Sequence, residues 1–196
     1  MRLAVDGPWI PFDAEQRFEG TGLDFAWRAH ARIARLLPVT VVDAFAGGRG
    51  ALTVRAFGLV PLMRAASTPD LDRGEVLRAL AELPWHPGAY AAPPPGLSFA
   101  EVGPSTLRAT FDDGRTRAAV DLELGDDGRV LRASAPDRPY AERGRAAVPT
   151  PWGGAFSDWV TFGALRVPTR AEVAWHLPAG PFVYWRGQIL DVRLDV

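Results

Sequence analysis

The stretch Asp-Arg-Gly-Glu-Val-Leu-Arg-Ala-Leu-Ala-Glu-Leu, residues 72–83, decides the fold because it is the only strong helical pattern in the chain. Asp72 is placed to cap this helix and Glu75 to reach back to it, as in a capping box. Pro84 ends the pattern. Apolar residues recur at helical spacing, so we expect one apolar face, made of Val76, Leu77, Leu80 and Leu83. A single amphipathic helix must bury that face against another element.

Nearly all of the remaining chain has the pattern of antiparallel strands. Residues 23–33 alternate strictly between apolar and polar side chains, which is typical of a long strand buried on one face. Asp-Gly pairs at 113–114 and 127–128 indicate hairpin turns. We expect strands at residues 2–5, 23–33, 39–45, 51–57, 59–65, 97–102, 106–111, 116–124, 129–135, 155–162, 171–177 and 182–194.

These patterns together predict one domain over residues 1–196, mainly β with one main helix (α+β). Because one helix accompanies many strands, we expect a curved antiparallel sheet, or half-barrel, with the helix on its concave face.

Composition excludes several classes of function. The net charge is −1, so there is no overall attraction for nucleic acid or for an anionic membrane, and we expect no nucleic-acid partner. The chain contains no cysteine and no lysine, which excludes thiolate nucleophiles, zinc–thiolate sites and Schiff-base chemistry. Its three histidines lie on unrelated elements without metal-ligand spacing, so we expect no metal and no cofactor.

The chain as written shows no targeting or membrane-spanning pattern. Residues 1–11 lack the apolar core of a signal peptide, and no run of about 18 apolar residues occurs. We therefore expect a cytoplasmic protein, or an exported one if a segment precedes Met1.

Several short motifs resemble those of a known family. They are Trp9-x-x-Phe12-x-Ala14-x-Gln16, Gly48-x-Gly50, Leu80-Ala81-Glu82-x-x-Trp85-x-Pro87, Pro168-Thr169-Arg170 and Trp175. Together they resemble an uncharacterised family of small bacterial proteins, a domain of unknown function, over residues 9–194. More distantly, the order of elements is similar to that of the LolA/LolB lipoprotein carriers. That resemblance implies a half-barrel whose concave apolar face is plugged by helices and holds acyl chains.

Several aromatic residues occupy the alternate strand positions that we expect to point inward, which suggests a binding pocket beneath the helix. The chain has seven tryptophans, a residue type that lines apolar pockets as well as filling cores. One helix covers little of a wide sheet, so we expect a hydrophobic ligand there, with a dry, close-packed core as the alternative. The candidate ligand-binding residues are Phe25, Trp27, Phe45, Phe57, Glu82, Trp85, Trp175 and Trp185.

Glu82 is the polar member of this set, in the last turn of the predicted helix. A buried carboxylate there would have a raised pKa and would bind a polar head group or act as an acid. A solvated surface glutamate is the alternative. A helix C-terminus is unfavourable for an anion, so we expect an arginine partner, with Arg49 and Arg170 as candidates.

Three functions follow from these residues. The first is non-catalytic binding of an apolar or acyl, lipid-like ligand. The second is a structural or protein-interaction domain that uses the proline-rich segment 85–96 or the charged segment 136–147. The third is a carboxylate-dependent hydrolase or isomerase in which Glu82 acts with Glu172 or Asp43. Oligomeric state is left open by the sequence.

Overall fold

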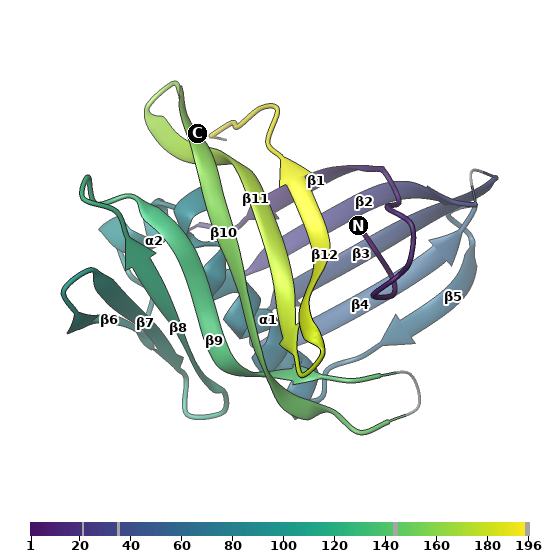
Figure 1. Ribbon diagram of the computed structural model, residues 1–196, viewed down its shortest axis with the longest axis horizontal. Coiled ribbons are helices and arrows are strands. Elements are labelled where there is room, and N and C mark those ends of the chain that lie inside the picture. The colour runs from purple at the N-terminus through teal and green to yellow at the C-terminus, as the bar shows by residue number, and fades with distance from the viewer. Residues whose placement is uncertain (21, 35, 143–144, 195–196) are drawn as a thin grey trace.

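The strands of the computed structural model form two antiparallel sheets with a helix between them (Figure 1). The structure describes residues 1–20, 22–34, 36–142 and 145–194. One sheet has five strands in sequential order, and they are β1 (Phe12–Phe18), β2 (Phe25–Ile33), β3 (Leu37–Ala46), β4 (Arg49–Ala56) and β5 (Val60–Ala65).

The other sheet has seven strands, again each paired with its neighbour in sequence. They are β6 (Leu97–Gly103), β7 (Thr106–Asp112), β8 (Arg117–Leu124), β9 (Val130–Tyr140), β10 (Val148–Phe162), β11 (Leu165–Leu177) and β12 (Gly180–Gln188). Both predicted Asp-Gly turns are present, and Gly114 and Gly128 adopt the positive φ that such turns require. The predicted class, mainly antiparallel β with one main helix, is confirmed.

Helix α1 (Pro69–Ala81) is buried from two sides because it contacts both sheets. It packs against β3 and β4 of the five-stranded sheet and against β7, β8 and β9 of the seven-stranded sheet. Val76, Leu77 and Leu80 are fully buried in the main core. Among the residues that the structure describes, no helix is long and apolar enough to span a membrane.

The predicted helix cap is wrong. Thr68 is the N-cap, and its hydroxyl accepts a hydrogen bond from the backbone N–H of Leu71. Pro69 occupies the first turn, where the missing N–H costs nothing. Asp72 and Glu75 lie inside the helix and are both buried. They face the five-stranded sheet and do not form a capping box.

Other predicted elements also differ from the structure. The strands form two sheets, where the sequence suggested one curved sheet. Residues 2–5 form no strand, and β1 is a strand that the pattern did not reveal, because polar Gln16 occupies an inward position. Residues 83–91 contain a 3-10 turn, η1 (Leu83–Trp85), and a short helix, α2 (Gly88–Ala91), instead of a purely extended crossing.

The charged segment 136–147 is partly strand. β9 continues to Tyr140, which pairs with Val148 of β10. Arg143, a member of that segment, lies outside the described residues. The last strand ends at Gln188, earlier than the sequence suggested.

Candidate functional site

Helix α1 carries a polar stripe on the side that faces the five-stranded sheet. Asp72, Glu75, Arg78 and Glu82 follow one another at helical spacing and therefore share one face. Each contacts that sheet. The backbone N–H of Gly50 donates to Asp72 Oδ1 at 2.7 Å, and a Cβ placed on Gly50 would lie 3.0 Å from Cγ of Glu75. The sheet is thus held to the helix by polar groups as well as by apolar packing.

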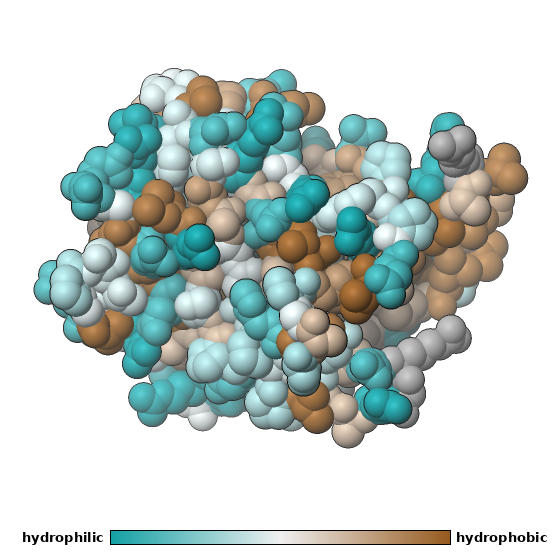
Figure 2. Space-filling view, viewed as in Figure 1, coloured by the Kyte–Doolittle hydropathy of each residue, from teal (hydrophilic) through white to brown (hydrophobic). Residues whose placement is uncertain are grey.

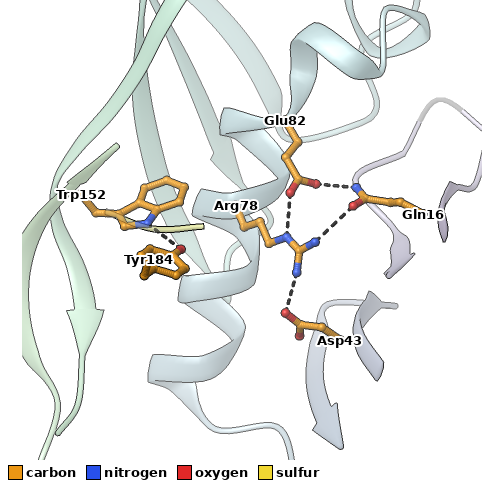
Figure 3. A network of polar contacts seen from close by, with 6 residues as sticks. All are labelled: Gln16, Asp43, Arg78, Glu82, Trp152 and Tyr184. Carbon is orange, nitrogen blue, oxygen red and sulfur yellow. Dashed lines mark hydrogen bonds and ion pairs between the residues drawn. The ribbon is translucent and has the colours of Figure 1, made fainter. Parts of the chain in front are cut away.

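Arg78 is the centre of this stripe (Figure 3). Its Nη1 lies 2.5 Å from Asp43 Oδ2 on β3, and its Nε lies 2.8 Å from Glu82 Oε1. Nη2 donates to the side-chain oxygen of Gln16 on β1 at 3.1 Å, and Gln16 in turn donates to Glu82. The guanidinium also packs over the ring of Phe25, 4.6 Å from its centroid. One arginine therefore joins α1 to three strands of the five-stranded sheet.

A second arginine approaches α1 from the seven-stranded sheet. Arg138 of β9 packs over the indole of Trp152 at 4.2 Å and over that of Trp175 at 5.6 Å. A Cβ placed on Gly74 of α1 would lie 3.8 Å from Arg138 Nε. Next to it, the indole N–H of Trp152 donates to the hydroxyl of Tyr184 at 3.0 Å (Figure 3). The seven-stranded sheet thus adds a second guanidinium, that of Arg138, beside the helix that carries Arg78.

Burial changes the protonation of the acids in this cluster. Burial, followed by the charge of Asp43, raises the pKa of Glu75 to about 7, against the effect of Arg138 and Arg78. Burial also raises the pKa of Asp43, although Arg78 acts in the opposite direction. Burial disfavours the charge on Arg78, but Glu82 and Asp43 outweigh it and raise the pKa of Arg78 above its ordinary value.

The charges of the cluster do not balance when every group is ionised. It contains three carboxyl groups (Asp43, Glu75, Glu82) and two guanidinium groups (Arg78, Arg138), so full ionisation leaves one uncompensated negative charge. Three of its buried polar atoms have no hydrogen-bond partner among the described residues, and they are Asp43 Oδ1, Glu75 Oε2 and Arg138 Nη1. A proton on Glu75 or Asp43 removes the charge imbalance at low cost.

The structure brings together two of the three acids that the hydrolase or isomerase hypothesis names. Glu82 and Asp43 do converge, as the enzyme hypothesis required, but each is bound to Arg78 and their side chains are only 14% and 16% exposed. Glu172 does not join them, since it pairs with Arg186 on the exposed side of β11. Because Arg78 binds both carboxylates, we call this network the ion-pair clamp between α1 and the five-stranded sheet. No three acidic or histidine side chains among the described residues are grouped to hold a metal ion.

Glu82 has an arginine partner, but not one that the sequence suggested. Arg78, one turn earlier on the same helix, binds it, while Arg170 pairs with Asp158 at 2.9 Å and Arg49 is exposed. The i, i+4 spacing of Arg78 and Glu82 was visible in the sequence. Asp43 and Gln16 were not identifiable as further partners, because only the sheet brings them to the helix.

Most of the predicted aromatic residues gather between the sheets. Phe25, Trp27 and Phe45 are buried on the five-stranded sheet. Trp85, Trp175 and Trp185 are partly buried against the same core from the other side. Phe57 does not join them, because it lies in the turn after β4 and is 64% exposed.

These rings contact one another directly. The Trp185 centroid is 6.0 Å from that of Phe12 and 6.2 Å from that of Trp85, and Phe12 in turn meets Trp27 at 5.8 Å. The indole N–H of Trp85 donates to the backbone oxygen of Pro168 at 2.8 Å. This part of the predicted pocket is therefore packed with side chains.

Open space lies elsewhere. A cleft of about 340 Å³ is lined by Phe45, Leu23 and Phe111 together with the proline-rich segment at Pro94 and Pro95. A second cleft, of about 270 Å³, lies near the C-terminal residues 191–194. Of the predicted ligand-binding residues, only Phe45 lines either one.

The side chains on the inner face of the five-stranded sheet become more exposed to solvent from β2 to β5. Leu52 is the cross-strand partner of Asp43, whose side chain points toward the helix. Leu52 and Val54 therefore lie on the same inner face of the sheet as Asp43. Val54 and Leu52 are half-buried, and beyond them Met63 and Val60 are 46% and 55% exposed. We call these four residues, Leu52, Val54, Val60 and Met63, the open face. Figure 2 shows apolar atoms exposed on the right of the molecule, where β4 and β5 lie.

Comparison with known proteins agrees with the motifs in the sequence. Neither curated proteins nor solved structures yielded a match, so the similarity to the LolA/LolB carriers rests on the order of elements alone. A family model, described as a family of unknown function, matches residues 1–187. The motifs at Gln16, Gly50, Glu82 and Trp85 meet in the structure at the polar stripe of α1 and the packed rings beside it. The chain therefore belongs to the family of unknown function DUF6544.

Proposed function

We propose that this protein binds an apolar, acyl-chain-like ligand without covalent chemistry, and that the ligand lies along the open face. The observation that carries the proposal is the exposure of Met63 and Val60 on the inner face of a sheet on which Trp27 and Phe45 are buried. Neighbouring exposed apolar side chains are a common feature of binding sites.

The surroundings of the open face suit an extended hydrophobic ligand. The packed rings of Trp27, Phe12 and Trp185 form a rigid apolar border on one side. On the seven-stranded sheet, Trp175 is the cross-strand neighbour of buried Trp152 and is itself only partly buried, so it turns toward the same interior. An acyl chain lying there would cover apolar surface that is now in water, which gives about 25 cal/mol for each Å² covered.

The ion-pair clamp supports this function indirectly. Arg78 joins α1 to β1, β2 and β3, and the helix also packs against the start of β4 at Gly50. In this position the helix leaves Val60 and Met63 of β5 exposed.

Binding is tested with a fluorescent fatty-acid probe on the full chain, together with organic extraction and native mass spectrometry of the purified protein. Val54→Glu places a charge on the open face, and we expect probe affinity to fall at least about tenfold. Thr53→Glu, on the opposite face of the same strand, is the matched control and should leave affinity unchanged. A chain that carries no extractable ligand and binds the probe no better than Val54→Glu would refute the proposal.

A further inference from the structure

One end of the five-stranded sheet exposes a group of large apolar side chains, of which all but Val60 lie outside the proposed ligand site. We call it the apolar tip. Leu36 is 86% exposed, Leu59 83% and Phe57 64%, and the tip consists of Leu36, Phe57, Leu59, Val60 and Leu62. It is formed by two neighbouring turns, since the backbone N–H of Phe57 donates to the oxygen of Pro38 at 2.9 Å. Exposed apolar residues grouped in this way mark an interaction surface.

Phenylalanine is unfavourable in the backbone conformation that residue 57 adopts. The backbone N–H of Leu59 donates to the oxygen of Ala56, which closes a β-turn with Phe57 and Gly58 at its centre. Both central residues have positive φ, +53° and +71°. Such a turn favours Asn followed by Gly, and a bulky aromatic residue is strained there. Neither turn geometry nor core packing accounts for a phenylalanine at this point.

The part of the chain that forms β2 to β5 is basic, although the whole chain has a net charge of −1 and the neighbouring β1 carries the exposed acids Asp13 and Glu15. Between Phe25 and Ala65 the sequence contains six arginines and one acidic residue. That acid, Asp43, points inward and binds Arg78. Arg32, Arg55 and Arg64 are exposed on the outer face beside the tip, and within the described part of the chain no carboxylate lies within ion-pair distance of them.

We propose that the apolar tip docks this protein on an anionic lipid bilayer. The side chains of Phe57, Leu59 and Leu36 enter the boundary between head groups and acyl chains, where apolar groups leave water. Arg32, Arg55 and Arg64 then meet the lipid phosphates. A nucleic acid would satisfy the arginines but would leave the leucines in water, so the bilayer accounts for both halves of the surface.

Docking at this end has a consequence for the proposed ligand site. Val60 belongs to both the apolar tip and the open face, so the two surfaces are continuous. A bilayer at the tip would place lipid acyl chains at the edge of the open face. The docking itself does not depend on ligand binding, because it rests on the tip and the arginines alone.

The test is co-sedimentation of the full chain with vesicles of phosphatidylcholine alone or mixed with phosphatidylglycerol. We expect binding to the mixed vesicles to be at least about tenfold tighter and to weaken as salt is added.

Phe57→Asn with Leu59→Ser should reduce binding at least about tenfold. Since asparagine fits the turn, the thermal midpoint of Phe57→Asn should rise, which separates lost binding from lost folding. Val102→Ser, at an exposed valine on β6, is the control.

Separate substitutions test the arginines beside the apolar tip. Arg55→Gln with Arg64→Gln should remove most of the preference for phosphatidylglycerol, whereas Arg117→Gln on β8 should keep it. Binding that is unchanged in the Phe57 and Leu59 variant, or the absence of binding to either kind of vesicle, would overturn the proposal. Tighter binding to a DNA duplex than to the mixed vesicles, insensitive to Phe57→Asn, would also overturn it. Val54→Glu should lose the fatty-acid probe and keep the vesicles, so the two proposals fail separately.

Discussion

Arg78 of α1 and Asp43 of β3 form an internal ion pair, with Nη1 and Oδ2 2.5 Å apart and side chains 14% and 16% exposed. The two residues are far apart in sequence and belong to different layers of the fold. Their contact ties the helix to the five-stranded sheet, and the hydrogen bond from the backbone N–H of Gly50 on β4 to Asp72 ties it at a second point. The helix thus covers β3 and the start of β4 and leaves Val60 and Met63 of β5 exposed.

Removing the central cation should be costly. We expect Arg78→Met to lower the free energy of unfolding by about 3–5 kcal/mol, because Asp43 and Glu82 would be left buried without a counter-charge. Urea unfolding measures the change. Arg186→Met breaks the exposed pair with Glu172 and should cost less than about 1 kcal/mol. Similar losses in the two variants would mean that the Arg78 network does not hold the layers together.

The buried acid gives stability a pH dependence. Glu75 keeps its proton in the folded protein up to a pKa of about 7, whereas the unfolded chain releases it near the ordinary value of 4.5. The folded state therefore binds more protons between these values, and stability falls as pH rises through this window. We expect Glu75→Gln to be more stable than the wild type by roughly 1–3 kcal/mol at pH 8, with little difference at pH 4.

Thermal unfolding across this pH range measures the effect of Glu75→Gln. Glu101→Gln, at an exposed glutamate on β6, is the matched control and should change stability little at either pH. A Glu75→Gln variant less stable than the wild type at pH 8 would show that the ionised carboxylate is favourable in the fold.

Gly50 is required by the close approach of α1 to β4. A Cβ at this position would lie 3.0 Å from Cγ of both Leu71 and Glu75. We expect Gly50→Ala to destabilise the protein by about 1–3 kcal/mol, since either the helix or the strand must move. Gly103→Ala, whose nearest new contact is at 3.5 Å, should be much milder. Equal effects of the two substitutions in urea unfolding would contradict this explanation.

The observed helix cap is Thr68, whereas the sequence predicted Asp72, and substitutions at these two residues test the difference. Thr68→Ala removes a single cap and should cost about 1 kcal/mol. Asp72 accepts hydrogen bonds from Gly50 N–H at 2.7 Å, Ser67 Oγ at 2.8 Å and Arg115 Nη2 at 2.9 Å. Asp72→Ala should therefore cost more, about 2–3 kcal/mol. A larger loss for Thr68→Ala would show that the contacts of Asp72 contribute little.

Local patterns were enough to predict the class of the fold. The alternation in residues 23–33, the two Asp-Gly turns and the helical spacing around Val76 depend on near neighbours in the chain, and each corresponds to an element of the structure. Membership of an uncharacterised family was also predicted from short motifs, and a family model of unknown function matches residues 1–187. The basic bias between Phe25 and Ala65 was present in the sequence too, but the net charge of the whole chain concealed it.

Only the tertiary structure decided that the strands divide into two sheets and that the helix is buried from both. Periodicity tells which side chains share a face, but it does not tell what that face meets. The helical spacing therefore left open whether Glu82 is buried or solvated. In the structure β1 and β3 supply Gln16 and Asp43 to Arg78 and allow the polar side of α1 to be buried. A buried charge depends on partners from distant parts of the chain, so its environment is a property of the assembled layers.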